Sequence, residues 1–415
     1  MEEPLNRRVI YRLIFMLLAV CGLIRIAPPL LARPSAGPAT RVPQWRVRLA
    51  ALTPRGRIKS IASAQVADWT TSGRIRLLAA GKNVNLTMPE LLSLRRRAGA
   101  VPTRTSGPSS WWLHLRTGDV LAGTPVASSG GKMAFDSVVF GKMTVPINDV
   151  AGLTRQRKTP MLHGISHDHI QFINGDHLSG AMLQFLSQAV QWKSSLGTIS
   201  IPLARIATIN LAQTLAPSVY RGPRIRMTFS DGTMVTASAM AWRGTALVLT
   251  VPSITAIKCG VATSQRIDIL GGNLTWLTDI APQKYVQIPY VGTPWPLVNN
   301  GSCVMRSLKV NGRVFRHGLG THVAARLIYN LADKYSKLTF IPAMDQSSRP
   351  WGSCKVLVQA DGKTVYTSGI LTPGELLPPV LLPVKQVKAV EFIISGIHAY
   401  GVRGRVDILN AALLR

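Results

Sequence analysis

The chain has 415 residues, of which 47% are hydrophobic and only 16% are charged. This length and composition exclude a disordered chain and allow two or more domains with sizeable cores. A formal net charge of +30 arises from 48 Lys and Arg residues against 18 Asp and Glu residues. Such a charge attracts polyanions, whether nucleic acid, anionic lipid or acidic polysaccharide. Because the basic residues are spread along the chain, a general bias toward arginine accounts for the charge as well.

The N-terminus has the composition of an export signal. Basic residues precede an apolar run from Leu13 to Ile24, and the segment from Pro28 to Thr40 is rich in Pro, Ala and Gly. This order predicts a signal peptide or an N-terminal membrane anchor plus linker over residues 1–40. The run of about 12 residues is shorter than the roughly 20 that span a bilayer as a helix. Either outcome predicts an exported protein that is membrane-anchored, periplasmic or at the cell surface, where carbohydrate is a better partner than nucleic acid.

Four copies of one pattern, each of about 55 residues, fill the middle of the chain. Each copy alternates apolar and polar residues, turns at a Gly-Asp or Asp-Gly pair and alternates again, which is the signal of a β-hairpin. The match is plainest between Trp112–Gly123 and His169–Gly180. We therefore expect tandem small β-sheets or barrels, each burying its apolar face against itself or a neighbour. The predicted repeats cover residues 41–101, 111–158, 165–213 and 222–270.

Each repeat is also expected to close on a strand. The two clearest copies close at Val145–Val150 and Ile201–Ile206, and a proline is the second residue of each segment. Because proline lacks an N–H group, we expect it at the start or the edge of the closing strand. The last copy is expected to close at Val251–Pro252.

Motifs of catalysis and metal binding are scarce. The four cysteines include no Cys-x-x-Cys pair, which argues against a zinc ribbon and leaves one disulfide open among Cys259, Cys303 and Cys354. His167 and His169 would share a face of a strand, but His169 aligns with Trp112 in the sister repeat, which argues against a metal site there. The acids of the C-terminal region show no obvious pair of the kind a glycosidase uses. We therefore expect no enzymatic activity.

Gly318 and Gly320 belong to a Gly-Leu-Gly-Thr-His segment that superficially resembles a dinucleotide-binding loop. Val323 stands where that loop needs its third glycine, and no strand–helix unit follows. The glycines are better explained as positions where a strand is packed too closely for a side chain.

Several segments of the C-terminal third occur in the order of one family of β-sandwich modules. They are Tyr285–Leu297, Arg316–His322, Leu327–Leu331 with Tyr335, Asp345, Gly352-Ser353, Asp361-Gly362, Ser368-Gly369 and Val406–Ala411. On these residues, the region 271–415 resembles the NPCBM type of carbohydrate-binding module. The resemblance implies an all-β chain in which the repeats precede a C-terminal β-sandwich of the jelly-roll, galactose-binding-like kind. Similar repeats ahead of this module are expected in exported proteins of planctomycete-like bacteria.

The resemblance also implies a binding site in loops at one end of the sandwich. A sugar offers an apolar face and a rim of hydroxyl groups, so its site needs aromatic rings and hydrogen-bonding groups. The candidates are Trp295, His322, Trp351, Tyr400 and Arg403, although each also has an explanation in packing or loop structure. The last turn carries arginines where relatives have an acid or a histidine, which suits an anionic envelope glycan.

Asp345 is the candidate metal ligand. Sandwich modules of this kind often hold a structural calcium ion through an acid and loop carbonyl groups. A hydrogen bond that braces the loop is the alternative role for this carboxylate.

These observations lead to one hypothesis and two alternatives. The leading hypothesis is non-catalytic carbohydrate binding by an exported, envelope-associated protein of several domains, held at the membrane through its N-terminal segment. The alternatives are a structural or protein-interaction scaffold that has lost sugar binding, and a polyanion-binding protein that depends on its positive charge.

Overall fold

The computed structural model describes residues 43–415, apart from 98–110, 158, 160, 163–164, 196, 213–221, 255 and 398–402. The predicted signal or anchor and Tyr400 lie outside the described residues. Within them, regular structure consists of strands and short 3₁₀ turns, so the all-β prediction is confirmed. No helix in this part of the chain is long and apolar enough to cross a bilayer.

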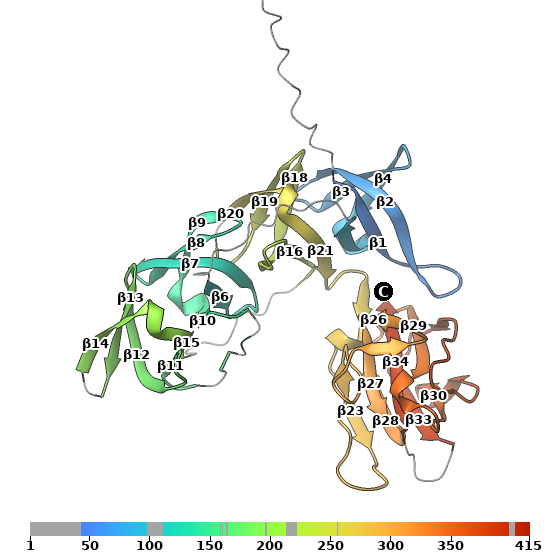
Figure 1. Ribbon diagram of the computed structural model, residues 1–415. Helices are drawn as coiled ribbons and strands as arrows, with labels where there is room; N and C mark the ends of the chain where they lie inside the picture. The colour runs from blue at the N-terminus through green and yellow to red at the C-terminus, as the bar shows by residue number, and fades with distance from the viewer. Residues whose placement is uncertain are drawn as a thin grey trace, which may run out of the picture. The chain divides into compact units, whose positions relative to one another are not determined.

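The strands of the repeats fall into four groups, seen from blue to yellow in Figure 1. The first contains β1 (Trp45–Leu52), β2 (Ile58–Trp69), β3 (Arg74–Ala79), β4 (Lys82–Thr87) and β5 (Leu91–Arg96). The second contains β6 (Trp111–Leu115), β7 (Val120–Ser129), β8 (Lys132–Ser137), β9 (Gly141–Pro146) and β10 (Val150–Thr154). The third contains β11 (Asp168–Phe172), β12 (His177–Phe185), β13 (Ala189–Ser194), β14 (Gly197–Pro202) and β15 (Ile206–Asn210). The fourth contains β16 (Arg224–Phe229), β17 (Met234–Ala237), β18 (Ala239–Arg243), β19 (Ala246–Thr250), β20 (Ala256–Gly260) and β21 (Ser264–Leu270).

The predicted hairpins form where the Gly-Asp pairs stand. Strands β6 and β7 are joined by a turn in which Gly118 has a φ of 84°, and Gly175 has a φ of 95° in the equivalent turn between β11 and β12. A side chain is strained in this left-handed region, which explains why both repeats place glycine there.

The closing strands differ from the prediction. Pro146 and Pro202 do not lie in the closing strands but end β9 and β14, and each precedes a 3₁₀ turn, η2 (Ile147–Asp149) or η3 (Leu203–Arg205). Their φ values of −58° and −59° are what proline prefers, and the closing strands β10 and β15 begin only after the turns. Among the described residues β9 pairs only with β8 and β14 only with β13, so the expectation of an edge position is confirmed. In the fourth group, Val251-Pro252 lies between β19 and β20, and η4 (Val261–Thr263) precedes the true closing strand β21. The first group has the same turn as η1 (Met88–Glu90).

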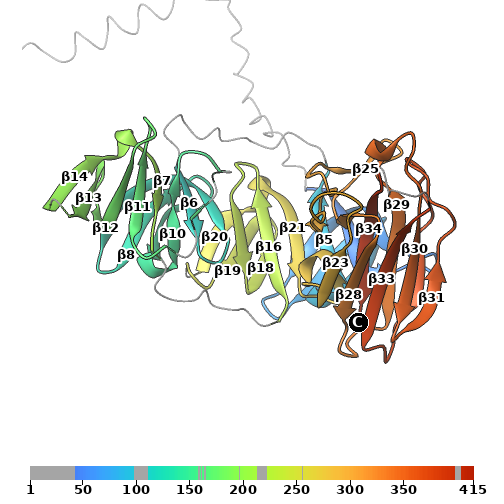
Figure 2. The ribbon, with the colours of Figure 1, turned by 90° about the horizontal axis from the view of Figure 1, so that it is seen from below.

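The first and last strands of the groups pair across group boundaries. The order β1–β5–β21–β16 joins the first group to the fourth, and β6–β10–β15–β11 joins the second to the third. Figure 2 shows β16 beside β21 and β6 beside β10. One face of each sheet is apolar and contributes to a shared core. In this core Trp45 and Trp242 pack edge to face, with ring centroids 5.6 Å apart. Each apolar face is therefore buried partly by a neighbouring repeat.

The C-terminal module contains two facing sheets, coloured orange to red in Figure 1. One has the order β24 (Val298–Asn299), β27 (Gly318–His322), β34 (Arg405–Leu414), β29 (Lys337–Met344) and β32 (Val380–Pro383), with β22 (Leu274–Trp276) also on β34. The other has the order β23 (Lys284–Gln287), β28 (Ala325–Asn330), β33 (Ala389–Gly396), β30 (Cys354–Ala360) and β31 (Lys363–Thr367). A small hairpin of β25 (Leu308–Val310) and β26 (Arg313–Phe315) and two 3₁₀ turns, η5 (Leu277–Asp279) and η6 (Gln346–Ser348), complete it. Leu319 and Ile408 of the first sheet share a core with Leu327 and Phe392 of the second, which confirms the predicted β-sandwich.

The glycines of the Gly-Leu-Gly-Thr-His segment are required by packing. A Cβ atom on Gly320 would lie 2.2 Å from the carbonyl oxygen of Gly301 and 2.7 Å from the nitrogen of Cys303. On Gly318 it would lie 2.9 Å from the carbonyl oxygen of Ile408. Neither glycine has a positive φ, so lack of space and not backbone conformation excludes a side chain. The expectation of a closely packed strand is confirmed.

Candidate functional site

Four loops of the module meet at one end of the sandwich. His322 ends β27 opposite Arg405, which begins β34, and Met344 ends β29 opposite Val406. Gln287 ends β23 and donates a hydrogen bond of 3.0 Å to the carbonyl group of Val323. The segments that follow β23, β27 and β29 and the segment that precedes β34 therefore share this end, which we call the loop end.

Trp295 and His322 form an aromatic pair at the loop end. Their rings are stacked, with centroids 5.1 Å apart and planes inclined by 10°. Gln287 holds Trp295 in place because its side-chain oxygen accepts a hydrogen bond of 2.8 Å from the backbone N–H of Trp295. The Tyr285 hydroxyl donates to the Trp295 carbonyl at 2.8 Å and lies 2.9 Å from the Thr321 hydroxyl. Two side chains of β23 thus fix the loop that carries the tryptophan.

The environment of His322 keeps its ring neutral. Burial lowers the pKa of His322, and the nearby positive charge of Arg405 lowers it further, while a hydrogen bond with the Val323 backbone acts in the opposite direction. A half-buried, neutral imidazole stacked on an indole offers an apolar surface with polar edges.

Trp351 and Arg403 lie on adjacent loops of the same end. Trp351 is 71% exposed, so the prediction of an exposed loop tip is confirmed. The Arg403 guanidinium donates to the carbonyl oxygen of Arg349, two residues before this tryptophan. The structure therefore brings Arg403 to the Trp351 loop, and Arg405 likewise donates to the carbonyl group of Ser347 at 3.2 Å.

Sequence reasoning missed three exposed residues in the loop that carries Trp295. Ile288, Tyr290 and Val291 are 68%, 67% and 81% exposed. Large exposed apolar side chains grouped in one loop are typical of surfaces that bind a ligand or a partner. These residues could have been predicted from the sequence, because three apolar residues follow the end of an amphipathic strand in the Tyr285–Leu297 segment.

A second missed feature is a pair of buried acids, Asp345 and Asp407. Asp345 behaves as the loop-bracing alternative requires: its carboxylate accepts hydrogen bonds from the backbone N–H of Ser347, at 2.8 Å, and from the Ser347 hydroxyl. Asp407 is fully buried, and neither of its carboxyl oxygens has a donor among the described residues. Burial, followed by the charge of the nearby Asp345 carboxyl group, raises the pKa of Asp407 well above its ordinary value.

These two acids bear on the calcium prediction. Calcium takes six to eight oxygen ligands, and the described residues contain no group of three metal-ligating side chains. Two carboxyl groups supply part of a calcium site, and backbone carbonyl groups or water would have to supply the rest. A calcium ion at Asp345 therefore stays a prediction. Burial keeps both acids from a glycan, so this pair is unsuited to glycoside hydrolysis.

The cysteines and histidines considered from the sequence have other roles here. Cys259, Cys303 and Cys354 are all free thiols. His169 lies 3.0 Å from the Ser179 hydroxyl, and the Asp168 carboxylate accepts backbone hydrogen bonds from Met182 and Ala212.

Replacing Gln287 by Ala tests how the aromatic pair is held. The substitution leaves the backbone N–H of Trp295 and the backbone carbonyl of Val323 without their partner, so we expect a loss of about 1–3 kcal/mol in the free energy of unfolding. Chemical denaturation measures this loss. The nearby exposed Val291→Ala is the control and should change the stability by less than about 0.5 kcal/mol.

Comparison with known proteins shows which family the C-terminal module resembles. Residues 274–413 match the family model of the NPCBM/NEW2 domain. A segment of 107 residues is 26% identical to a Renibacterium salmoninarum protein named "Putative endo-alpha-N-acetylgalactosaminidase", and the match covers 26% of this chain and 7% of that protein. The chain thus spans only a small part of that relative's length.

Two solved structures are also similar. One is a CBM51 module from Clostridium perfringens GH95 in complex with methyl-galactose, with 19% identity, 34% of this chain and 99% of that chain covered, and a TM-score of 0.30. The other contains the tandem CBM51 modules of a family 98 glycoside hydrolase from Streptococcus pneumoniae. It is 12% identical, the match covers 89% of this chain and 88% of that chain, and the TM-score is 0.30. The family match coincides with the strands β22 to β34 that build the sandwich. Residues 274–413 of this chain therefore form a domain of the NPCBM/NEW2 family.

Proposed function

We propose that the NPCBM/NEW2 domain binds carbohydrate at the loop end and catalyses no reaction on it. The observation that carries this proposal is the stacked pair of Trp295 and His322, held by Tyr285 and Gln287, in a loop that also carries the exposed Tyr290. An aromatic surface of this kind can pack against the apolar face of a sugar ring. The match to a family of carbohydrate-binding modules supports the same class of ligand.

Trp351, Arg403 and Tyr400 belong to the proposal as a second part of the surface. The exposed indole and the guanidinium would contact a longer glycan or its acidic groups. The proposed setting is an exported, envelope-associated protein, because residues 1–40 have the composition of a signal or anchor.

A protein-interaction scaffold is the second candidate function. The exposure of Ile288 and Val291 favours it, because apolar side chains at a loop tip suit a protein surface.

Glycan binding by the whole chain tests the proposal. We expect retention on immobilised neutral galactose- or N-acetylhexosamine-containing glycans, and we expect Trp295→Ala to weaken it at least about tenfold through loss of ring packing. Trp112→Ala, a half-buried tryptophan of β6 outside the domain, is the matched control and should leave glycan affinity unchanged. If no glycan binds, or if both variants lose affinity equally, the proposal fails and the scaffold remains.

A further inference from the structure

The sheet β1–β5–β21–β16 has two very different faces. Val47, Leu94, Ile267 and Met227 stand opposite one another across the four strands and are all fully buried in the core. Because neighbouring residues of a strand point to opposite faces, the residues beside these four lie on the outer face of the sheet.

Arginines dominate this outer face. Arg46, Arg95 and Arg266 stand opposite one another on β1, β5 and β21. In the next row, Arg48 and Ser93 are followed by Asp268 and Arg226. Like charges in directly opposite positions destabilise a sheet, so this row of arginines lowers the stability of the folded protein. A bound anion would reduce the repulsion between the guanidinium groups.

Few acids compensate this charge. Asp268 pairs with Arg266 at 2.6 Å, and Asp279 is the other acid that lines the pocket over this face, which has a volume of about 190 Å³. Arg316 of the module adds another positive charge, since it, like Arg266, lowers the pKa of Arg48, although burial is the larger cause. The face therefore keeps an excess of guanidinium groups over carboxylates.

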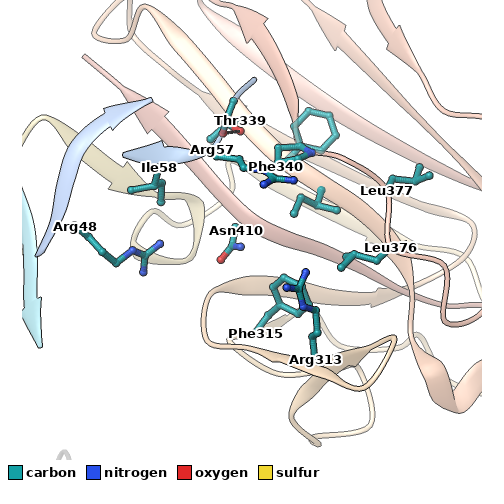
Figure 3. Close-up of a pocket in the computed structure, with 13 residues that line it drawn as sticks. Arg48, Arg57, Ile58, Arg313, Phe315, Thr339, Phe340, Leu376, Leu377 and Asn410 are labelled. Atoms are coloured by element: carbon teal, nitrogen blue, oxygen red, sulfur yellow. Dashed lines mark hydrogen bonds between the residues drawn. The ribbon is translucent and has the colours of Figure 1, made fainter. Parts of the chain in front are cut away.

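Arg48 also lines a larger pocket, of about 310 Å³, on its other side (Figure 3). Two further arginines, Arg57 and Arg313, line this pocket together with the Asn410 amide, and none of its lining residues is an acid. Figure 3 shows the three guanidinium groups around Asn410, beside the rings of Phe315 and Phe340. Three guanidinium groups over an apolar floor, with no acid among the lining residues, match a ligand that has both an acidic group and an apolar face.

We propose that this pocket and the adjoining arginine face bind an acidic saccharide, in which carboxylate or sulfate groups pair with Arg48, Arg57 and Arg313 while a sugar ring packs on Phe315. Guanidinium groups bind carboxylate and sulfate through paired N–H donors. The volume of the pocket suits about one sugar residue. None of its lining residues belongs to the loop end, so the site is separate from the loop end and does not depend on the function proposed there. A single-stranded nucleic acid would instead need exposed aromatic rings for base stacking. Among the described residues, the large exposed aromatic side chains are Tyr290 and Trp351, both at the loop end.

Calorimetric titration of the whole chain tests this site. The probes are a heparin-derived hexasaccharide for sulfate, an oligogalacturonate for carboxylate and an uncharged oligogalactoside of similar length. We expect at least one acidic probe to bind and the uncharged one not to bind at this site. Affinity should fall as salt rises, because the contacts are ionic.

Arg48→Gln should lower the affinity for the acidic probe at least tenfold. Arg74→Gln is the matched control, since Arg74 is an exposed arginine of β3 in the same repeat and lines neither pocket. It should change the affinity less than twofold. Thermal unfolding should show that Arg48→Gln is folded, because the substitution relieves repulsion from Arg266.

Three results would overturn the site: neither acidic probe binds, both variants lose affinity equally, or an oligonucleotide of equal charge binds more tightly than the saccharides. Trp295→Ala distinguishes this site from the loop end, because it should leave acidic-probe affinity at Arg48 unchanged.

Discussion

Replacing Asp407 by Asn is expected to stabilise the domain at pH 7, by about 2 kcal/mol in the free energy of unfolding. Asp407 is fully buried, its carboxyl oxygens lack donors among the described residues, and its charged neighbour is another acid, Asp345. At neutral pH the native state must therefore either bury an unpaired charge or bind a proton that the unfolded chain releases. An amide of the same shape removes both costs.

The raised pKa of Asp407 determines how the free energy of unfolding changes with pH. Because the native pKa of Asp407 is raised, the native state binds more protons than the unfolded state above the ordinary pKa of aspartate. Stability linked to this group is fully present below that ordinary pKa and is lost as the pH rises through the raised value. Asp407→Asn should therefore flatten the pH profile, and its advantage should disappear in acid. Urea unfolding between pH 3 and pH 8, in the presence of EDTA, measures this.

Asp361 provides a control of opposite sign. It is an exposed turn residue whose pKa is lowered by hydrogen bonds from the backbone N–H groups of Ala389 and Lys388. Its contribution to stability is present above the ordinary pKa and is lost as the pH falls, so Asp361→Asn should destabilise the domain at pH 7 but not in acid. If Asp407→Asn instead destabilises the domain at pH 7, and calcium stabilises only the wild type, the two buried acids hold the predicted ion.

Replacing Gly320 by Ala is expected to destabilise the domain by at least about 3 kcal/mol. The new methyl group would lie 2.2 Å from the Gly301 carbonyl oxygen and 2.6 Å from the Ser302 Cα atom. Both are backbone atoms, so the strand or the loop must move, whereas ordinary overpacking of side chains costs about 1–3 kcal/mol. Thermal unfolding should show a lower midpoint, and glycan binding should weaken because Thr321, next in the chain, contacts the Tyr285 hydroxyl.

Gly369→Ala is the control for this substitution. A Cβ atom at Gly369 would meet nothing within 4 Å, and its φ is not positive. The variant should be at least as stable as the wild type, since alanine restricts the unfolded chain more than glycine does. Equal midpoints for the two variants would contradict the packing explanation of the Gly-Leu-Gly-Thr-His segment.

Much of the local structure could be predicted from the amino-acid sequence. Alternation of apolar and polar residues around Gly118 and Gly175 was enough to place two hairpins, because the turn needs a backbone conformation that favours glycine. The order of short motifs was enough to identify the sandwich, and Trp351, between a proline and a glycine, was recognisable as an exposed loop tip. Pro146 and Pro202 lie on edge strands as expected, but their assignment to the closing strands was wrong, because the 3₁₀ turn after them has no periodicity of its own.

Which residues lie close together in space could not be predicted, because it depends on contacts between distant parts of the chain. Asp345 and Asp407 are far apart in the chain, and the antiparallel register of β29 and β34 makes them neighbours. The stacking of Trp295 on His322 depends on hydrogen bonds from β23, and the arginine row depends on the pairing of the first repeat with the fourth. Sequence patterns report the face on which a side chain lies, since that follows from local backbone geometry. Which faces and loop ends meet is set by long-range pairing, and in this protein that pairing forms both proposed sites.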